Sequence, residues 1–348
     1  MAVFNIMTKD MGIDLGTANT LIYIKDTGIV LNEPSVIAVE NRRGITLGVG
    51  LEAKNMIGKA PANIDVIRPL KDGVISDFDI TADMLTAFIE KAVSANKVKT
   101  FRVVVGVPSG VTEVEKRAVK EVVQQMGASE VYILEEPMAA AIGAGLDVDS
   151  STACMIADIG GGTSDIAIIA LGGIVASTSI RYAGDKFNEA IIQYMRKRYA
   201  LYIGERTAEQ LKISVGCAQL DKDENGNEII ETVKASGRDL ISGLPKIIEV
   251  TNKDMMLALQ ESLDIIVDGI RQTIEKAPPE IAADIANTGM MLSGGGGLIR
   301  NLDKIVEDAT GLSVTTAENA FEAVATGTGM SLNDIEKLRI YATGIYRG

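Results

Sequence analysis

The sequence predicts an α/β protein built from two related domains. Its 348 residues exceed the usual size of one hydrophobic core, which favours two domains of roughly 100–200 residues each. Short β-branched strands alternate with amphipathic helical segments, as in α/β folds. One strand–turn–strand pattern occurs twice, at 12–24 and at 156–169, which indicates that the two domains have related cores.

The first half of the chain predicts a strand meander followed by alternating helices and strands. Short strands fill 12–39, and the last of them runs from 29 to 39. A helix is expected over 81–95, where apolar side chains recur at helical spacing behind Thr81 as N-cap. The next expected elements are a buried strand at 101–110, a helix at 112–126 with a Thr112–Glu115 capping box, a strand at 131–136 and a helix after Pro137.

A polar link at 147–152 separates this half from a second series of strands and helices. The later elements predicted are strands at 153–171 and 172–180, helices at 185–199 and 205–216, an exposed hairpin tip at 221–228, a helix at 254–276, a strand with a glycine turn at 289–297 and a helix at 298–309.

The composition argues against several classes of protein. A net charge of -13 repels a phosphate backbone, and the densest basic run, 196–198, fits a solvated helix face, so no nucleic-acid partner is expected. The chain has no His, and Cys154 and Cys217 are far apart without CxxC spacing, which disfavours a zinc site or a His-based triad. No 18-residue apolar span or signal-peptide core occurs, and two isolated cysteines suit a reducing cytosol, so we expect a cytoplasmic protein.

The repeated pattern contains two glycine turns that could hold a triphosphate. The turns at 16–19 and 160–163 offer backbone N–H groups, because glycine lets the chain approach phosphate oxygens closely. Neither turn matches a P-loop or contains Lys, so charge compensation falls to a metal. Asp14 and Asp158, each at a strand end, suit Mg²⁺, which takes one or two carboxylates plus phosphate oxygens. Either hairpin alone is more simply an ordinary Asp-Gly turn, whereas both together favour the site.

A third glycine turn follows the strand predicted near 290. Residues 293–301 do not fit a GxGxxG phosphate turn, so a surface lying under an adenine or ribose is the better functional interpretation. Helix-to-strand packing is the structural alternative.

These motifs resemble those of the actin, Hsp70 and sugar-kinase superfamily and, more narrowly, the MreB/Mbl family of bacterial actins. GIDLGTANT resembles the first phosphate motif, DIGGGTSD the second, EEPMAAAIG the first connecting helix and GMMLSGGGGLIRNL the adenosine motif. IGERTAEQLK, GRDLISGLPK and PPEIAADI extend the likeness over essentially the whole chain.

The resemblance implies an α/β, actin-like ATPase fold in which two related RNase H-like domains, divided into four subdomains, flank a nucleotide cleft. Domain I would comprise 1–147 with the C-terminal 330–348, and its small subdomain about 33–75. Domain II would comprise 148–329, and its small subdomain about 186–249.

The resemblance also assigns roles to residues of the cleft. Asp14, Asp158 and Asp165 would organise Mg²⁺ largely through water, and Glu136, assisted by Thr163, would orient the water that attacks ATP. Such an attack needs a positioned water more than a strong base. From the sequence alone, Glu136 could equally be a capping or solvated carboxylate. The nucleotide-binding residues implied are Gly16, Thr17, Ala18, Asn19, Gly160, Gly161, Gly162 and Thr163 around the phosphates, Glu209 and Lys212 at the ribose and adenine edge, and Gly294, Gly295 and Gly296 facing the adenosine.

Three functions share such a cleft: a polymerising ATPase, a sugar kinase or other non-polymerising ATPase, and an Hsp70 chaperone. The chain ends at Gly348 without a peptide-binding domain, which disfavours the chaperone. We expect a slow ATPase that binds ATP or ADP with Mg²⁺ and assembles head to tail into paired filaments controlling cell shape.

Relatives in the family lie on the inner face of the cell membrane, where we also expect shape or wall-synthesis proteins as partners. The apolar residues of segment 1–8 form a marginal anchor that would need the avidity of a filament, or else a strand covering the core. The loop at 95–101 offers little apolar surface, which argues against insertion by this loop.

Overall fold

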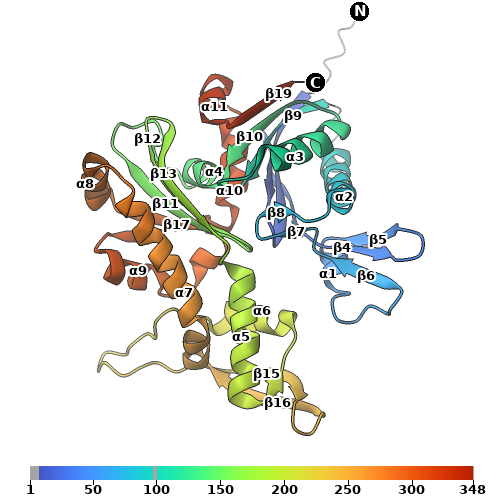
Figure 1. The fold of residues 1–348 in the computed structure, drawn as a ribbon, viewed down its shortest axis with the longest axis vertical. Coiled ribbons are helices and arrows are strands. Elements are labelled where there is room, and N and C mark those ends of the chain that lie inside the picture. The colour runs from blue at the N-terminus through green and yellow to red at the C-terminus, as the bar shows by residue number, and fades with distance from the viewer. Residues whose placement is uncertain (1–7, 97–99, 348) are drawn as a thin grey trace, which may run out of the picture.

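The computed structural model describes residues 8–96 and 100–347, and two mixed β-sheets form its centre (Figure 1). The first sheet has six strands in the order β19-β10-β9-β1-β2-β3. β1, β9 and β10 run parallel, whereas β2, β3 and β19 are antiparallel to their neighbours. The strands are β1 (Thr8–Leu15), β2 (Asn19–Ile24), β3 (Gly28–Pro34), β9 (Thr100–Val107), β10 (Ala128–Glu135) and β19 (Gly344–Arg347).

The second sheet repeats this arrangement with five strands in the order β13-β12-β11-β17-β18. Here β11, β17 and β18 run parallel, and β12 and β13 continue from β11 as antiparallel hairpins. The order β3-β2-β1-β9-β10 therefore recurs strand for strand, which confirms the related cores predicted from the repeated pattern. The strands are β11 (Cys154–Ile159), β12 (Ser164–Ala170), β13 (Gly173–Ile180), β17 (Met290–Ser293) and β18 (Val314–Thr316).

Two helices, α4 (Glu136–Gly143) and α10 (Ala323–Ser331), lie between the sheets and share one apolar cluster with both (Figure 1). Their backbones touch where they cross. A Cβ added to Gly143 would overlap the carbonyl oxygen of Ala323, and one added to Gly327 would overlap that of Ala139. Glycine is required at both positions because any side chain would push the helices apart.

Helices also cover the outer faces of the two central sheets. α2 and α3 pack on the first sheet, while α5 and α7 pack on the second. Their bounds and those of the remaining helices are α2 (Phe78–Asn96), α3 (Glu113–Gln125), α5 (Gly184–Tyr199), α6 (Glu205–Val215), α7 (Asn252–Glu275), α8 (Pro279–Thr288), α9 (Leu302–Thr310), α11 (Ile335–Tyr341) and the short 3-10 turns η1 (Gly296–Leu298) and η2 (Ala320–Glu322). No helix in the described part of the chain is long and apolar enough to cross a membrane.

A small sheet extends from each half of the molecule (Figure 1). The first comprises β4 (Ile37–Glu40), β5 (Ile45–Val49) and β6 (Ile64–Ile67) with α1 (Leu51–Lys54), beside the hairpin β7 (Leu70–Lys71) and β8 (Val74–Ile75). The second comprises β14 (Leu201–Tyr202), β15 (Thr232–Asp239) and β16 (Pro245–Thr251). We call them the first and second small subdomains.

The predicted domain division stays a prediction. One proposed boundary, 147/148, falls in the link between α4 and β11, and the other, 329/330, falls inside α10. Since α10 packs on α4 and β1, and β19 pairs with β10, the chain returns to the first half before residue 330.

Three predicted elements are wrong in detail. The strand over 29–39 is two strands, because β3 ends at Pro34, which has no N–H to continue a ladder, and β4 belongs to another sheet. The helix at 81–95 begins earlier, at Phe78. Its cap is Asp77, whose carboxylate accepts from the Ile80 N–H at 3.1 Å, rather than Thr81.

The helix predicted from 298 begins only at Leu302. Asn301 before it adopts a left-handed backbone with φ of 62°, a conformation that interrupts a helix and that Asn tolerates better than most residues. Its side chain donates to the Gln219 carbonyl and the Asp221 carboxylate, which hold it there. In contrast, the Thr112–Glu115 capping box of α3 is confirmed, with both of its hydrogen bonds present. Residues 1–7 of the predicted membrane segment and 97–99 of the candidate loop lie outside the described residues.

Candidate nucleotide site

The two glycine turns predicted from the repeated pattern face each other across a cleft. A Cβ added to Gly161 would lie 2.6 Å from the Ala18 Cβ, and one added to Gly162 would lie 2.6 Å from the Thr17 Oγ1. The β1–β2 and β11–β12 turns therefore touch, and only glycine leaves room for the contact. The Thr17 hydroxyl also accepts a hydrogen bond from the Gly73 N–H at 3.0 Å, which ties the β7–β8 hairpin to the first turn.

The cleft holds a cavity of about 460 Å³, within the range of small-molecule sites. All of the predicted site residues except Asp165 line its wall: Asp14, Gly16, Thr17, Ala18, Asn19, Glu136, Asp158, Gly160, Gly161, Gly162, Thr163, Glu209, Lys212, Gly294, Gly295 and Gly296. The fold thus brings together residues nearly 300 positions apart in the sequence, while their individual roles stay predictions.

Four acidic side chains, Asp14, Glu136, Asp158 and Asp165, gather at the inner end of the cleft. Asp158 and Glu136 are buried, while Asp14 keeps a partial opening to the cavity although protein surrounds it elsewhere. Burial, with repulsion from Asp158, raises the pKa of Asp14 to about 8. Burial raises the pKa of Asp158 to about 7, although a hydrogen bond from the Ser293 hydroxyl at 2.7 Å opposes the change. The pKa of Glu136 is raised by burial and then by Asp165, Asp14 and Asp158.

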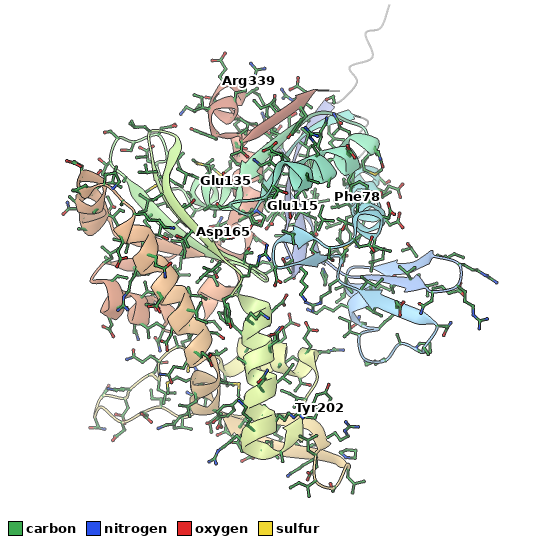
Figure 2. The ribbon with its side chains drawn as sticks, in the orientation of Figure 1. Phe78, Glu115, Glu135, Asp165, Tyr202 and Arg339 are labelled. Atoms are coloured by element: carbon green, nitrogen blue, oxygen red, sulfur yellow. The ribbon has the colours of Figure 1, made fainter. Side chains whose placement is uncertain are left out.

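Asp165 lies behind the cavity wall rather than on it. Its Oδ1 accepts a hydrogen bond from the Ser109 N–H at 2.8 Å, and Oδ2 has no hydrogen-bond partner within reach among the described residues, although the Ser179 and Thr163 hydroxyls lie close enough to lower its pKa. Burial outweighs them and raises that pKa to about 6. Figure 2 shows Asp165 beside Glu135 at the centre of the molecule.

The acidic cluster fits a hydrated cation better than a directly caged one. Among the described residues no group of three or more Asp, Glu or Cys side chains converges as metal ligands. Mg²⁺ commonly keeps several waters and takes few carboxylates, so this geometry suits an ion bound mainly through water and phosphate. A cation here would lower the raised pKa values by stabilising the charged carboxylates.

Apolar side chains line the opposite end of the cavity. Ile213, Leu298 and Phe321 face it and are 76%, 57% and 40% exposed. Exposed apolar surface inside a cavity suits a flat base. The predicted adenosine turn lies against one of them, since a Cβ added to Gly295 would contact the Phe321 ring at 3.3 Å. Phe321 has no signal in the sequence because it follows no glycine motif, and Ile213 has none because the family segment 203–212 ends at its neighbour Lys212.

Apart from Glu205 and the predicted Glu209, the charged residues at the mouth of the cleft have no motif in the sequence. Lys54 and Arg68 of the first small subdomain reach Glu209, Asp185 and Glu205 on the opposite wall. In the sequence, Lys54 and Arg68 are single charged residues in segments without a motif. No neighbouring residue indicates which acidic side chain either of them would contact.

Lys212 lies deeper in the cleft, where its ammonium donates to the Gly184 carbonyl at 3.0 Å and burial lowers its pKa. Asn188, one helical turn after Gly184 on α5, is another lining residue without a sequence signal. It is buried, and its Oδ1 lacks a hydrogen-bond partner among the described residues.

Two halves with the same strand order, with paired Asp–Gly hairpins facing each other between them, define an actin-like fold. The chain belongs to the MreB/Mbl family, since the model of the MreB/Mbl protein family matches residues 8–340. The fold and family predicted from the sequence are confirmed.

Similar proteins agree with this assignment. The chain is 45% identical to the cell shape-determining protein Mbl of Bacillus subtilis, over 96% of this chain and 98% of that protein. It is 47% identical to the cell shape-determining protein MreB of Escherichia coli, over 95% of each. Among solved structures, MreB5 of Spiroplasma citri bound to ADP has a TM-score of 0.88 at 38% identity, covering 95% of this chain and 98% of that one. A MamK double helical filament, at 21% identity and a TM-score of 0.76, shares the fold over 94% of this chain and 99% of its own. The chain is thus a member of an actin-like cytoskeletal family of cell shape-determining proteins.

Proposed function

We propose that this protein binds ATP with Mg²⁺, hydrolyses it slowly and assembles head to tail into filaments on the inner face of the cell membrane. The observation that carries the proposal is the contact of two glycine turns above four acidic side chains. Backbone N–H groups there suit phosphate oxygens, and the acidic side chains suit a hydrated cation. MreB5 of Spiroplasma citri, similar over nearly its full length, has been solved with ADP and with AMPPNP.

Glu136 is the residue best placed to orient the attacking water. It begins α4 and is buried, yet it lines the cavity. Its carboxyl would accept a hydrogen bond from a water held in line with the γ-phosphate, with the Thr163 hydroxyl as a second contact. Mg²⁺, when bound, supplies positive charge that neutralises the phosphates and the acidic cluster. Asp14 and Asp158 would hold its waters, and Asp165 would support them from behind.

Exposed apolar side chains at opposite ends of the molecule support head-to-tail assembly. Ile241, Leu244 and Ile247 of the second small subdomain are 86%, 64% and 66% exposed, and this subdomain forms one end of the long axis (Figure 1). Leu171, after β12, and Ile340, in α11, are 72% and 70% exposed, and these elements lie toward the other end. Two unlike surfaces at opposite ends produce an open chain of subunits. The MamK relative was solved as a double helical filament, which supports a paired arrangement.

The cellular setting belongs to the same proposal. Filaments of this kind would lie peripherally on the cytoplasmic face of the membrane, where many weak anchors act together. Membrane-bound proteins of cell shape or wall synthesis are the partners that this position favours, as the names of the relatives suggest.

Sedimentation and phosphate release with Mg²⁺ and ATP test the proposal in one assay. The wild-type chain should pellet and release phosphate slowly. Glu136→Gln should still bind ATP and pellet but release phosphate at least about 100-fold more slowly, because it loses the water-orienting carboxylate. Ile241→Asp should bind ATP but remain in the supernatant, since a charge replaces an apolar contact.

Soluble wild-type protein that phosphorylates a sugar would instead establish the kinase alternative. Unchanged phosphate release by Glu136→Gln would remove that residue from the reaction.

A further inference from the structure

Two cationic side chains of the first small subdomain span the mouth of the cleft. Lys54, at the end of α1, places its Nζ 2.8 and 3.0 Å from the two carboxylate oxygens of Glu209 on α6. Arg68, just after β6, divides its guanidinium between two helices. One nitrogen lies 3.3 Å from Asp185 at the start of α5, and the other lies 2.5 Å from Glu205 at the start of α6.

These ion pairs separate two cavities. Lys54, Arg68 and Glu209 line the nucleotide cleft and also an outer cavity of about 230 Å³, whose wall continues through Glu205 and Arg206. The ion pairs therefore form part of the wall between the cleft and the outer cavity. Lys54, Arg68, Asp185 and Glu209 have side chains 26–31% exposed, so water screens them only in part.

One of the ion pairs is connected to the predicted phosphate site. The Asp185 N–H donates a hydrogen bond to the Gly161 carbonyl at 2.8 Å. The residue whose carboxylate contacts Arg68 is therefore also bonded through its backbone to the glycine turn. Gly161 in turn lies against Ala18 of the other half. A movement of the first small subdomain that breaks the Arg68 contacts therefore also acts on the turn that would hold the phosphates.

We propose that Lys54, Arg68, Glu209, Asp185 and Glu205 form a cross-cleft ionic clamp that opens before nucleotide leaves and so limits its release rate. The inference rests on the proposed nucleotide binding. Apart from Glu209, a predicted nucleotide contact, the clamp residues would act as positioning residues. They link the first small subdomain to α5 and α6, so their loss would shift the equilibrium between a closed and an open cleft. Exposed ion pairs add little to folding stability, so the effect should appear in nucleotide release rather than in unfolding.

Stopped-flow release of a fluorescent ADP analogue from the full chain tests the clamp. Arg68→Ala should accelerate release roughly fivefold, since it removes two contacts of modest strength. Arg206→Ala is the matched control, because Arg206 lines the same outer cavity, is exposed and has no ion pair among the described residues. The control should release the analogue at the wild-type rate.

Exchanging the charges of Arg68 and Glu205 distinguishes the effect of electrostatic attraction across the cleft from the effect of lost side-chain packing. Arg68→Glu should release nucleotide faster than Arg68→Ala, because it faces two carboxylates, and adding Glu205→Arg should recover part of the lost retention. In the wild type, raising salt from about 0.1 to about 1 M shortens the screening length from about 10 to about 3 Å and should accelerate release. Arg68→Ala should respond less to salt.

Equal release rates for wild type and Arg68→Ala, or equal acceleration by Arg206→Ala, would overturn the clamp. A wild-type release rate that does not depend on salt would also overturn the clamp. This measurement does not require any variant to fold. Failure of the proposed function looks different, because the wild-type chain would then show no saturable binding of the ADP analogue at all.

Discussion

The inner end of the cleft and its mouth are held closed by different forces. At the inner end, the Gly161 backbone lies against the backbone and the short side chain of Ala18, beside buried carboxylates. Neither residue has a long side chain that could move aside. At the mouth, long flexible side chains such as Lys54 and Arg68 make partly exposed ion pairs. The comparison indicates that close backbone packing fixes the predicted phosphate site. Ion pairs between flexible side chains, in contrast, are suited to control how nucleotide enters and leaves the cleft.

The largest effect is expected from adding a side chain at the inner end. Gly161→Val should weaken ATP and ADP binding at least about 100-fold, because its side chain would collide with Ala18 and separate the two turns by more than an ångström. Equilibrium titration with a fluorescent nucleotide measures the loss.

Gly204→Ala is the matched glycine control, since a Cβ there meets no atom within 4 Å and the backbone φ of -84° suits alanine. Nearly normal affinity in Gly161→Val would mean that the turns do not need to touch, and the contrast between the two ends would fail.

An intermediate effect is expected from the charge of the acidic cluster. Asp158 has a pKa of about 7 in the folded protein against an ordinary 3.8, so the folded state binds its proton more tightly than the unfolded chain does. The stability of the nucleotide-free protein should therefore fall as pH rises from about 4 to about 7. Asp158→Asn should raise the free energy of unfolding by about 2 kcal/mol at about pH 8 and change it little at about pH 4.

Chemical denaturation at the two pH values, with and without Mg²⁺ and ADP, measures this effect. The added nucleotide should stabilise the wild type far more than the variant, because Asp158 is a predicted contact for the hydrated ion. Asp308→Asn, at an exposed position of α9, should leave the pH dependence unchanged. A destabilised Asp158→Asn at high pH would show that the carboxylate is already neutralised in the nucleotide-free protein.

The smallest effect is expected from a single ion pair at the mouth. Lys54→Gln should weaken nucleotide affinity by about two- to fivefold, since a partly exposed pair contributes on the order of 1 kcal/mol or less. The same titration measures it. If Lys54→Gln lost as much nucleotide affinity as Gly161→Val, the mouth would contribute as much to binding as the inner end. The proposed difference between the two ends would then be wrong.

The sequence was sufficient for the inner end because each half of that site is local. An Asp, a glycine turn and two flanking strands occur within about a dozen residues, and the duplication showed that the two copies belong together. The Thr112–Glu115 box was equally local and is confirmed. All predicted nucleotide residues reach one cavity, although Asp165 lies behind its wall.

The mouth could not be predicted because its contacts depend on tertiary placement alone. Lys54 and Glu209 are 155 positions apart, and neither segment indicates the other. The errors in secondary structure have a similar origin. Pro34 ends one strand where hydrophobicity continues, and Asn301 is held left-handed by the distant Gln219 and Asp221. Local sequence patterns cannot predict a contact with a residue that is distant in the sequence and becomes a neighbour only on folding.

The crossing of α4 and α10 has a mechanical consequence for both ends. Gly143 and Gly327 let the two helices touch backbone to backbone, so the halves of the molecule cannot separate there without losing this contact. Any rotation of one half against the other would have to keep this point nearly fixed. A rotation displaces each atom in proportion to its distance from the pivot. A rotation about the crossing would therefore displace the small subdomains, which extend away from it, farther than the sheets that pack beside it (Figure 1).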